Sequence, residues 1–124
     1  TLDIMRLELN GGTVQFLKSG AAQSFLFRDG GLKAIGGQAF PAGILAECTP
    51  DVSELKLFDG DVLLMTSDGV EDATAREILR CNGMNAQEIV TALGAKALAQ
   101  RTGGRRDDIT IIAAKISLHD ENEK

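Results

Sequence analysis

The sequence predicts an α+β fold, in which helices cover one face of an antiparallel β-sheet. Three observations support this class. Short apolar runs separated by Asn-Gly and Asp-Gly pairs fill the first half, two segments with helical spacing follow, and a β-branched run comes last. Strands and helices are therefore segregated along the chain. The 124 residues fit one domain or most of one, and 44% hydrophobic and 25% charged residues are typical of globular proteins.

The first 36 residues predict an antiparallel meander of four strands. Asn10-Gly11 and Asp29-Gly30 separate pairs of apolar runs, and such dipeptides favour the positive φ angles of tight hairpin turns. The runs cover residues 2–9, 13–20, 23–28 and 32–36.

The middle of the chain predicts a third hairpin. Residues 40–44 indicate a loop or an edge segment, because Pro41 has no N–H to donate to a strand ladder. Residues 52–58 then alternate, and Asp59-Gly60 provides a turn. Residues 61–67 form a continuous apolar run, which is typical of a strand buried on both faces.

Two helices and a final strand complete the predicted fold. Helical spacing covers residues 71–81 and 86–100, with Asn85 and Glu88 placed as the two partners of a capping box. Residues 107–117 are rich in β-branched side chains and predict a central strand. The polar tail, residues 119–124, is expected to fray.

Composition argues against several functions. The net charge of -5 and the small basic cluster of Arg101, Arg105 and Arg106 argue against nucleic-acid binding. No apolar run reaches the roughly 18 residues of a membrane helix. Cys48 and Cys81 predict two reduced structural thiols in a cytosolic protein, although the sequence leaves a single disulfide open.

Chemistry in this chain must depend on carboxylates. The single histidine, His119, lies in the polar tail, which argues against a Ser-His-Asp triad and a His-rich zinc site. Asp68 ends one predicted strand, and Asp107 and Asp108 begin another. Antiparallel neighbours can bring these ends to one edge, where oxygen ligands suit Mg²⁺ or Mn²⁺. The alternative is that these residues only form a turn and a strand cap.

Two motifs in this order resemble the metal-dependent PPM-type Ser/Thr phosphatases. They are GDVLLMTSDGVEDA and, after the helices, GGRRDDITIIAAKI. In that family one strand ends in Asp-Gly, and a later strand begins with Asp-Asn or Asp-Asp. The upstream stretch KSGAAQSFLFRDGGLKAIGGQAFPAGIL is similar to the bacterial branch that regulates sigma-factor partners in sporulation. The resemblance extends from Leu2 to Ser117.

The resemblance implies a fold and a metal site. The antiparallel sheet would be part of a PPM-type β-sandwich, and residues 1–118 would be the C-terminal part of a phosphatase domain. Asp68 and Asp107 would be metal ligands for Mn²⁺ or Mg²⁺, with two ions in a complete domain. Asp108 matches the Asn position and is a weaker candidate, and Gly69 would permit a tight turn.

Other polar residues near these motifs have weaker implied roles. Thr110 is expected to be a structural or supporting residue. Arg105 and Arg106 could contact a phosphate, but a solvated loop is the better expectation. Glu71 and Asp72 are expected to lie near the metal edge without binding the ion directly.

The resemblance implies a protein serine/threonine phosphatase whose substrate is a phosphorylated anti-anti-sigma factor. Two metal ions would activate the attacking water, so no protein nucleophile would be needed. The family's early Asp-Gly pair, which supplies a bridging ligand, has no match, since Asp3 lies within the first strand and no Gly follows it. We therefore expect weak or absent activity, and loosely held metal or none, from this fragment of a domain.

The resemblance also implies expectations for assembly and location. Loss of two helices would expose apolar surface, so we expect a homodimer or a swapped assembly. The expected location is cytoplasmic, with a parent protein that can be membrane-anchored. Two alternatives stay open: a catalytically inactive, phosphatase-like protein-interaction module, and a structural domain in which both Asp motifs are turns.

Overall fold

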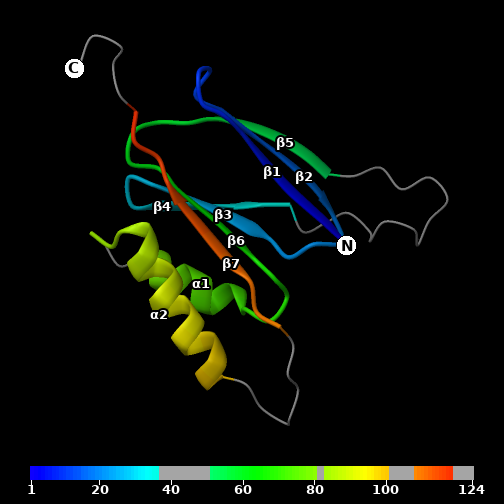
Figure 1. The fold of residues 1–124 in the computed structure, drawn as a ribbon, viewed down its shortest axis with the longest axis vertical. Coiled ribbons are helices and arrows are strands. Elements are labelled where there is room, and N and C mark those ends of the chain that lie inside the picture. The colour runs from blue at the N-terminus through cyan, green and yellow to red at the C-terminus, as the bar shows by residue number, and fades with distance from the viewer. Residues whose placement is uncertain (37–50, 81–82, 101–107, 119–124) are drawn as a thin grey trace, which may run out of the picture.

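The computed structural model describes residues 1–36, 51–80, 83–100 and 108–118, which form two antiparallel sheets and two helices (Figure 1). Sheet A has the strand order β1-β2-β5 and sheet B the order β4-β3-β6-β7. Helices α1 and α2 lie together on one side of sheet B. The elements are β1 (Leu2–Glu8), β2 (Thr13–Ser19), β3 (Ser24–Arg28), β4 (Gly31–Ile35), β5 (Asp51–Lys56), β6 (Val62–Thr66), α1 (Asp72–Leu79), α2 (Ala86–Ala99) and β7 (Ile111–Lys115).

The predicted α+β class is confirmed, but the pairing of strands differs from the predicted meander. The β1–β2 and β3–β4 hairpins form as expected. In contrast, β2 pairs with β5 and β3 pairs with β6, so the β2–β3 and β5–β6 connections each pass from one sheet to the other. The single four-strand meander and the third hairpin were therefore wrong. Two sheets form because Phe16 of sheet A and Leu26 of sheet B bury their side chains in one shared core.

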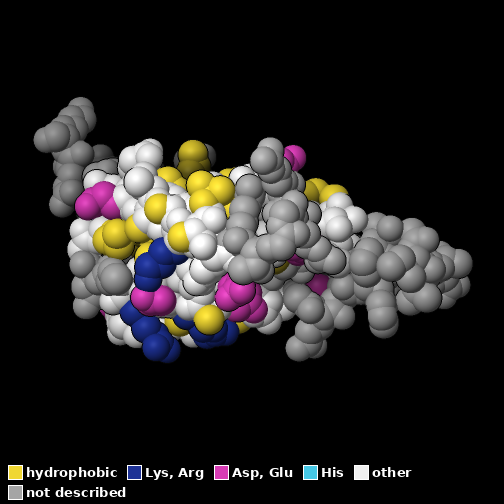
Figure 2. Space-filling view, turned by 90° about the horizontal axis from the view of Figure 1, so that it is seen from below, with side chains coloured by type: hydrophobic (Ala, Val, Ile, Leu, Met, Phe, Trp, Pro, Cys, Tyr) yellow, Lys and Arg dark blue, Asp and Glu magenta, His cyan; other side chains and the backbone are white. Residues whose placement is uncertain are grey.

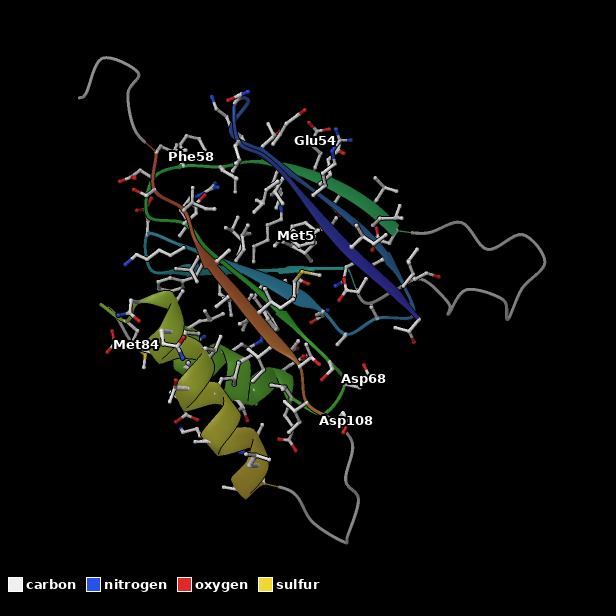
Figure 3. The ribbon with its side chains drawn as sticks, viewed as in Figure 1. Met5, Glu54, Phe58, Asp68, Met84 and Asp108 are labelled. Atoms are coloured by element: carbon white, nitrogen blue, oxygen red, sulfur yellow. The ribbon has the colours of Figure 1, made fainter. Side chains whose placement is uncertain are left out.

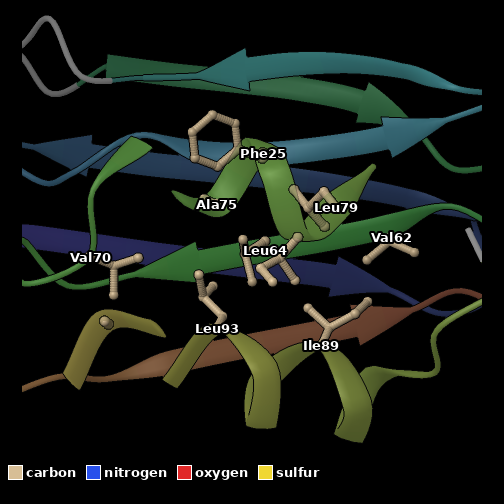
Figure 4. Packing of buried hydrophobic residues seen from close by; sticks show 10 residues of the cluster. Phe25, Val62, Leu64, Val70, Ala75, Leu79, Ile89 and Leu93 are labelled. Carbon is tan, nitrogen blue, oxygen red and sulfur yellow. The ribbon is translucent and has the colours of Figure 1, made fainter. Parts of the chain in front are cut away.

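Strand β6 separates two hydrophobic cores. Val62 and Leu64 face the helices and pack with Phe25, Ile89 and Leu93 (Figure 4). The alternate residues Leu63 and Met65 face sheet A. All five residues of β6 are buried, which confirms the prediction of a strand covered on both faces. The resulting layers are sheet A, sheet B and the helices.

The helix ends follow the predicted capping chemistry. The Asn85 side chain accepts a hydrogen bond from the Glu88 backbone N–H at 2.8 Å, and the Glu88 carboxylate accepts one from the Asn85 N–H at 3.1 Å. This reciprocal pair fixes the start of α2. Helix α1 begins after Glu71 and ends at Leu79, close to the predicted bounds.

Strand β7 differs from its prediction in length and position. It covers Ile111–Lys115 rather than residues 107–117, and it lies at the edge of the described part of sheet B instead of its centre. β-branched residues alone predicted a central strand, but such residues also suit an edge strand whose one face packs on α2.

Asp61, at the start of β6, is fully buried and holds one end of the sandwich together. It accepts two hydrogen bonds from the Arg28 guanidinium, at 2.8 and 2.7 Å, and a third from the Phe58 backbone N–H. The hydrogen bond to Asp61 raises the pKa of Arg28, against the opposing effect of desolvation. The Arg28 guanidinium also lies over the Phe58 ring at 4.5 Å. A buried carboxylate is stable here because a bidentate cation and a backbone donor satisfy it.

Several predictions concern residues outside the described ranges. These include the loop at 40–44, the two cysteines, the basic cluster, Asp107 and the polar tail. On the face seen in Figure 2, acidic and basic side chains lie next to one another, and the described residues there form no broad basic patch. Within the described ranges, neither helix has the length and apolar character needed to cross a membrane.

Leu64→Ala should lower the free energy of unfolding by about 3 kcal/mol, because it opens a cavity between sheet B and the helices where no side-chain atom is exposed. Chemical denaturation monitored by circular dichroism measures this change. Leu98→Ala is the matched control, since Leu98 is 57% exposed on α2 and should cost less than about 0.5 kcal/mol. Equal losses for the two variants would contradict the assignment of the core.

Candidate functional site

The end of β6 is joined to the segment before β7 through Ser67. The Ser67 backbone N–H donates to the Thr110 carbonyl at 2.9 Å, and the Thr110 N–H donates to the Ser67 hydroxyl oxygen at 2.9 Å. The Ser67 hydroxyl in turn donates to the Asp108 carbonyl at 3.4 Å. These contacts place Asp68 beside Asp108, although the two helices separate them in sequence (Figure 3). The predicted meeting of the two strand ends is therefore observed for Asp68 and Asp108, while Asp107 lies outside the described residues.

Gly69 permits a close approach between two chain segments. A turn over residues 67–70 is closed by the Val70 N–H, which donates to the Ser67 carbonyl at 3.3 Å. Gly69 is not among the described glycines with positive φ. A Cβ at this position would instead lie 3.0 Å from Cγ1 of Ile109. Gly69 thus leaves space for Ile109 rather than providing the turn geometry that the sequence suggested.

Asp68 lies in the wall of a hollow of about 280 Å³ between the two sheets. The hollow is lined by the start of β1, by Ala21 and Ala22 in the β2–β3 connection, by residues 65–68, and by Thr110 and Ile112. Both sheets and both joined strand ends therefore contribute to it. The Asp68 side chain is exposed, so a ligand can reach its carboxylate from solvent.

The donor atoms at this edge suit a hard divalent cation. Apart from the thioether of Met65, the polar side chains around the hollow present carboxylate and hydroxyl oxygens. Within the described ranges, no three His, Cys, Asp or Glu side chains are grouped so that they could hold a metal ion. The described residues would thus supply Asp68 and a hydroxyl-rich wall, and other carboxylate ligands would have to come from elsewhere.

The other predicted residues within the described ranges lie close to this edge but have other local roles. Glu71 is the N-cap residue of α1, and its carbonyl accepts from the N–H groups of Thr74 and Ala75. Asp72 is in the first helical turn, where a negative charge interacts favourably with the helix dipole. Thr110 lines the hollow and pairs with Ser67 through its backbone.

Sequence reasoning considered Asp3 only as a missing metal ligand and did not place it at the site, but it also lines the hollow. Its carboxylate forms an ion pair of 2.6 Å with Lys18, which lies directly opposite on β2. The hairpin register could have identified this pair, because strands of equal length around Asn10-Gly11 place residues 3 and 18 side by side. Ser67 was also missed, since no sequence pattern marks its hydroxyl as the link between strand ends.

The fold matches that of PP2C-type phosphatase domains. Two structures of the phosphatase domain of the cell fate determinant SpoIIE from Bacillus subtilis, one presoaked with Mn and one in a crystal form without domain swapping, each have a TM-score of 0.77. They are 27% and 26% identical, and the match covers 96% and 98% of this chain and 57% and 58% of theirs. The catalytic domain of the phosphatase PstP in complex with two manganese ions has a TM-score of 0.65 at 21% identity, over 93% of this chain and 58% of that one, and shows the fold alone.

Within this class, the chain belongs to the Stage II sporulation protein E (SpoIIE) family, whose sequence profile matches residues 1–117. The Stage II sporulation protein E of Priestia megaterium is 29% identical over 126 aligned residues. That alignment covers 94% of this chain but 22% of the relative, so the chain corresponds to a small part of such a protein. The predicted PPM-type resemblance and its β-sandwich are confirmed.

Gly69→Ala should lower the free energy of unfolding by about 1–2 kcal/mol, because the new methyl group presses on Ile109. Thermal or chemical unfolding measures the change. Adding Ile109→Ala removes the opposing carbon atom, so the loss from Gly69→Ala should be smaller in that background.

Gly11→Ala is the matched control for this substitution. The nearest side-chain atoms would be 3.8 and 3.9 Å from its Cβ, so its effect should stay below about 0.5 kcal/mol. If Gly69→Ala were equally mild, the tight approach of the two segments would not constrain this edge.

Proposed function

We propose that residues 1–118 are the C-terminal part of a metal-dependent protein serine/threonine phosphatase domain, followed by a polar tail at 119–124. The observation that carries this proposal is the position of Asp68, which is held at the rim of a hollow beside the start of the β7 segment. Its carboxylate has no hydrogen bond or ion pair with the residues described here, so it is available for a ligand. Membership of the SpoIIE family and the PP2C fold support the assignment.

In this proposal Asp68 and Asp107 bind Mn²⁺ or Mg²⁺, with two ions in the complete domain. When bound, such ions activate a water molecule and offset charge on the phosphoryl group. The Mn presoak of the SpoIIE phosphatase domain, which is 27% identical to this chain, supports the choice of metal. Further ligands would come from residues outside this chain, since the match covers about 57% of the SpoIIE phosphatase domain.

The chain's own residues would position the reacting groups. Ser67 and Thr110 fix the two strand ends by backbone and hydroxyl hydrogen bonds, which limits the movement of Asp68. Gly69 lets these ends approach closely. No described side chain is required as a nucleophile, so the chain would act by orienting the phosphoryl group and its ions.

The proposed substrate is a phosphorylated anti-anti-sigma factor, and its supporting evidence is membership of the sporulation family. A catalytically inactive, phosphatase-like interaction module is the alternative. The two are separated by activity, because only the phosphatase would hydrolyse a phosphoprotein and would need Asp68 to do so.

Asp68→Asn or Asp107→Asn, in a protein extended upstream to a complete domain, should lower Mn²⁺-dependent hydrolysis of a phosphoserine protein by about 100-fold or more. Release of inorganic phosphate measures this, and the 124-residue chain alone should show weak or no activity. The family pattern has Asn at position 108, so Asp108→Asn is the matched control and should retain activity. Hydrolysis that survives Asp68→Asn and Asp107→Asn would reject the proposed metal site. A complete domain that is inactive without any substitution would favour the interaction module.

We also propose that this chain alone forms a homodimer or a swapped assembly. The outer face of sheet A carries a cross-strand row of Ile4, Leu17 and Val52, of which Ile4 and Val52 are 46% and 63% exposed. Such a row is typical of a surface that another chain or segment covers. One SpoIIE structure is distinguished as a crystal form without domain swapping, and that distinction supports a swapped arrangement as one form of the proposed assembly.

Light scattering of the purified chain should therefore give the mass of a dimer, and Val52→Glu should shift it to a monomer by placing a charge in the row. Thr13→Glu is the matched control, because it adds the same charge at the polar end of the same face, opposite Lys56. A dimer that persists in Val52→Glu would exclude this surface as the contact, and a monomeric parent chain would exclude the assembly.

A further inference from the structure

Lys18 is a charged side chain buried behind the hollow. Its side chain is 2% exposed, and its ammonium donates to the Asp3 carboxylate at 2.6 Å and to the Ser24 hydroxyl at 2.7 Å. Burial of an ammonium is costly unless a partner compensates its charge. Asp3 provides that compensation, and the lysine end of the ion pair is almost completely shielded from solvent.

The position of this pair is fixed by both sheets. Asp3 and Lys18 belong to sheet A, whereas Ser24 is the first residue of β3 in sheet B. The Lys18 stem lies against Gly36, where a Cβ would overlap its Cδ and Cε atoms. Asp51 lies opposite Lys18 on β5, on the other side from Asp3. The ammonium is thus held between the sheets by contacts with residues of both.

This arrangement changes the electrostatics of the hollow. Asp3 and Asp68 are the acidic residues in its described lining. Asp3 is already bonded to a cation, whereas none of the described cationic side chains pairs with Asp68. A divalent ion that bound Asp3 would sit within a few ångströms of the Lys18 ammonium and be repelled by it. The two carboxylates therefore differ in what they can bind, although they share one cavity.

We propose that Lys18 is a positioning residue that acts as a built-in cation: it neutralises Asp3, keeps Asp3 out of the metal ligand set, and confines divalent-cation binding in the hollow to the Asp68 side. The assignment of the Asp68 side rests on the proposed phosphatase function. The neutralisation of Asp3 is independent of it, and the two parts can be tested separately.

The test is a calorimetric titration of the 124-residue chain with MnCl₂. Lys18→Met frees the Asp3 carboxylate, so it should create Mn²⁺ binding that persists when Asp68→Asn is added. Adding Asp3→Asn to Lys18→Met should weaken that binding by about tenfold or more, because affinity follows the charge of the ligands. A lysine with only a structural role would change thermal stability without creating binding that is independent of Asp68.

The neutral pair Asp3→Asn with Lys18→Met keeps the proposal testable if Lys18→Met alone does not fold. A buried ion pair can be replaced by neutral groups of similar size without loss of the fold. This double variant should bind Mn²⁺ as the parent chain does, because Asp3 is not a ligand in the parent. A tenfold loss of affinity in the double variant, or no Asp68-independent binding in folded Lys18→Met, would overturn the proposal. Where the parent chain binds Mn²⁺, failure of Asp68→Asn to weaken that binding would instead reject the proposed metal site.

Discussion

The burial of β6 on both faces is the constraint on which the rest of the structure depends. One face packs against the helices and the other against sheet A, so this strand cannot shift by one residue without exchanging the contents of the two cores. Its register therefore also determines where the chain leaves the sheet. Asp68 follows two residues after the last residue of β6, and its position is set by packing that lies far from its own carboxylate.

The candidate site is built from ordinary local chemistry at the end of that strand. The Ser67 hydroxyl accepts from the Thr110 N–H and donates to the Asp108 carbonyl, which joins the two segments beyond the last ladder pair of β6 and β7. A glycine allows them to touch. The opposite wall carries a carboxylate that is already neutralised by an internal ammonium. The hollow thus combines a fixed frame with one free acidic group among its described lining residues.

Much of the local structure could be predicted from sequence, because short-range rules decide it. The capping box at Asn85, the two hairpins and the continuous burial of β6 all followed from spacing and turn chemistry. The division into two sheets could not be predicted in the same way. Apolar and polar residues alternate with the same period whether consecutive strands pair within one sheet or pack face to face in two sheets. Asp68 was identified by its place after an apolar run, whereas Asp3 was set aside because its strand position hid its role. Asp107 itself lies outside the described residues, and the metal-ligand roles of Asp68 and Asp107 both stay predictions.

The two ends of the sandwich differ in a way that affects how the fold can vary. At one end, Arg28, Asp61 and the Phe58 backbone form a latch in which the buried carboxylate accepts two guanidinium hydrogen bonds and one from a backbone N–H. At the other end lie the hollow and the exposed Asp68. Strand β6 connects these two ends and also separates them. Substitutions that alter ligand binding at the hollow therefore need not disturb the Arg28–Asp61 contacts. Such a separation would let a lineage change what it acts on while its scaffold keeps the same stability, which makes the open end the part of the domain most free to diverge.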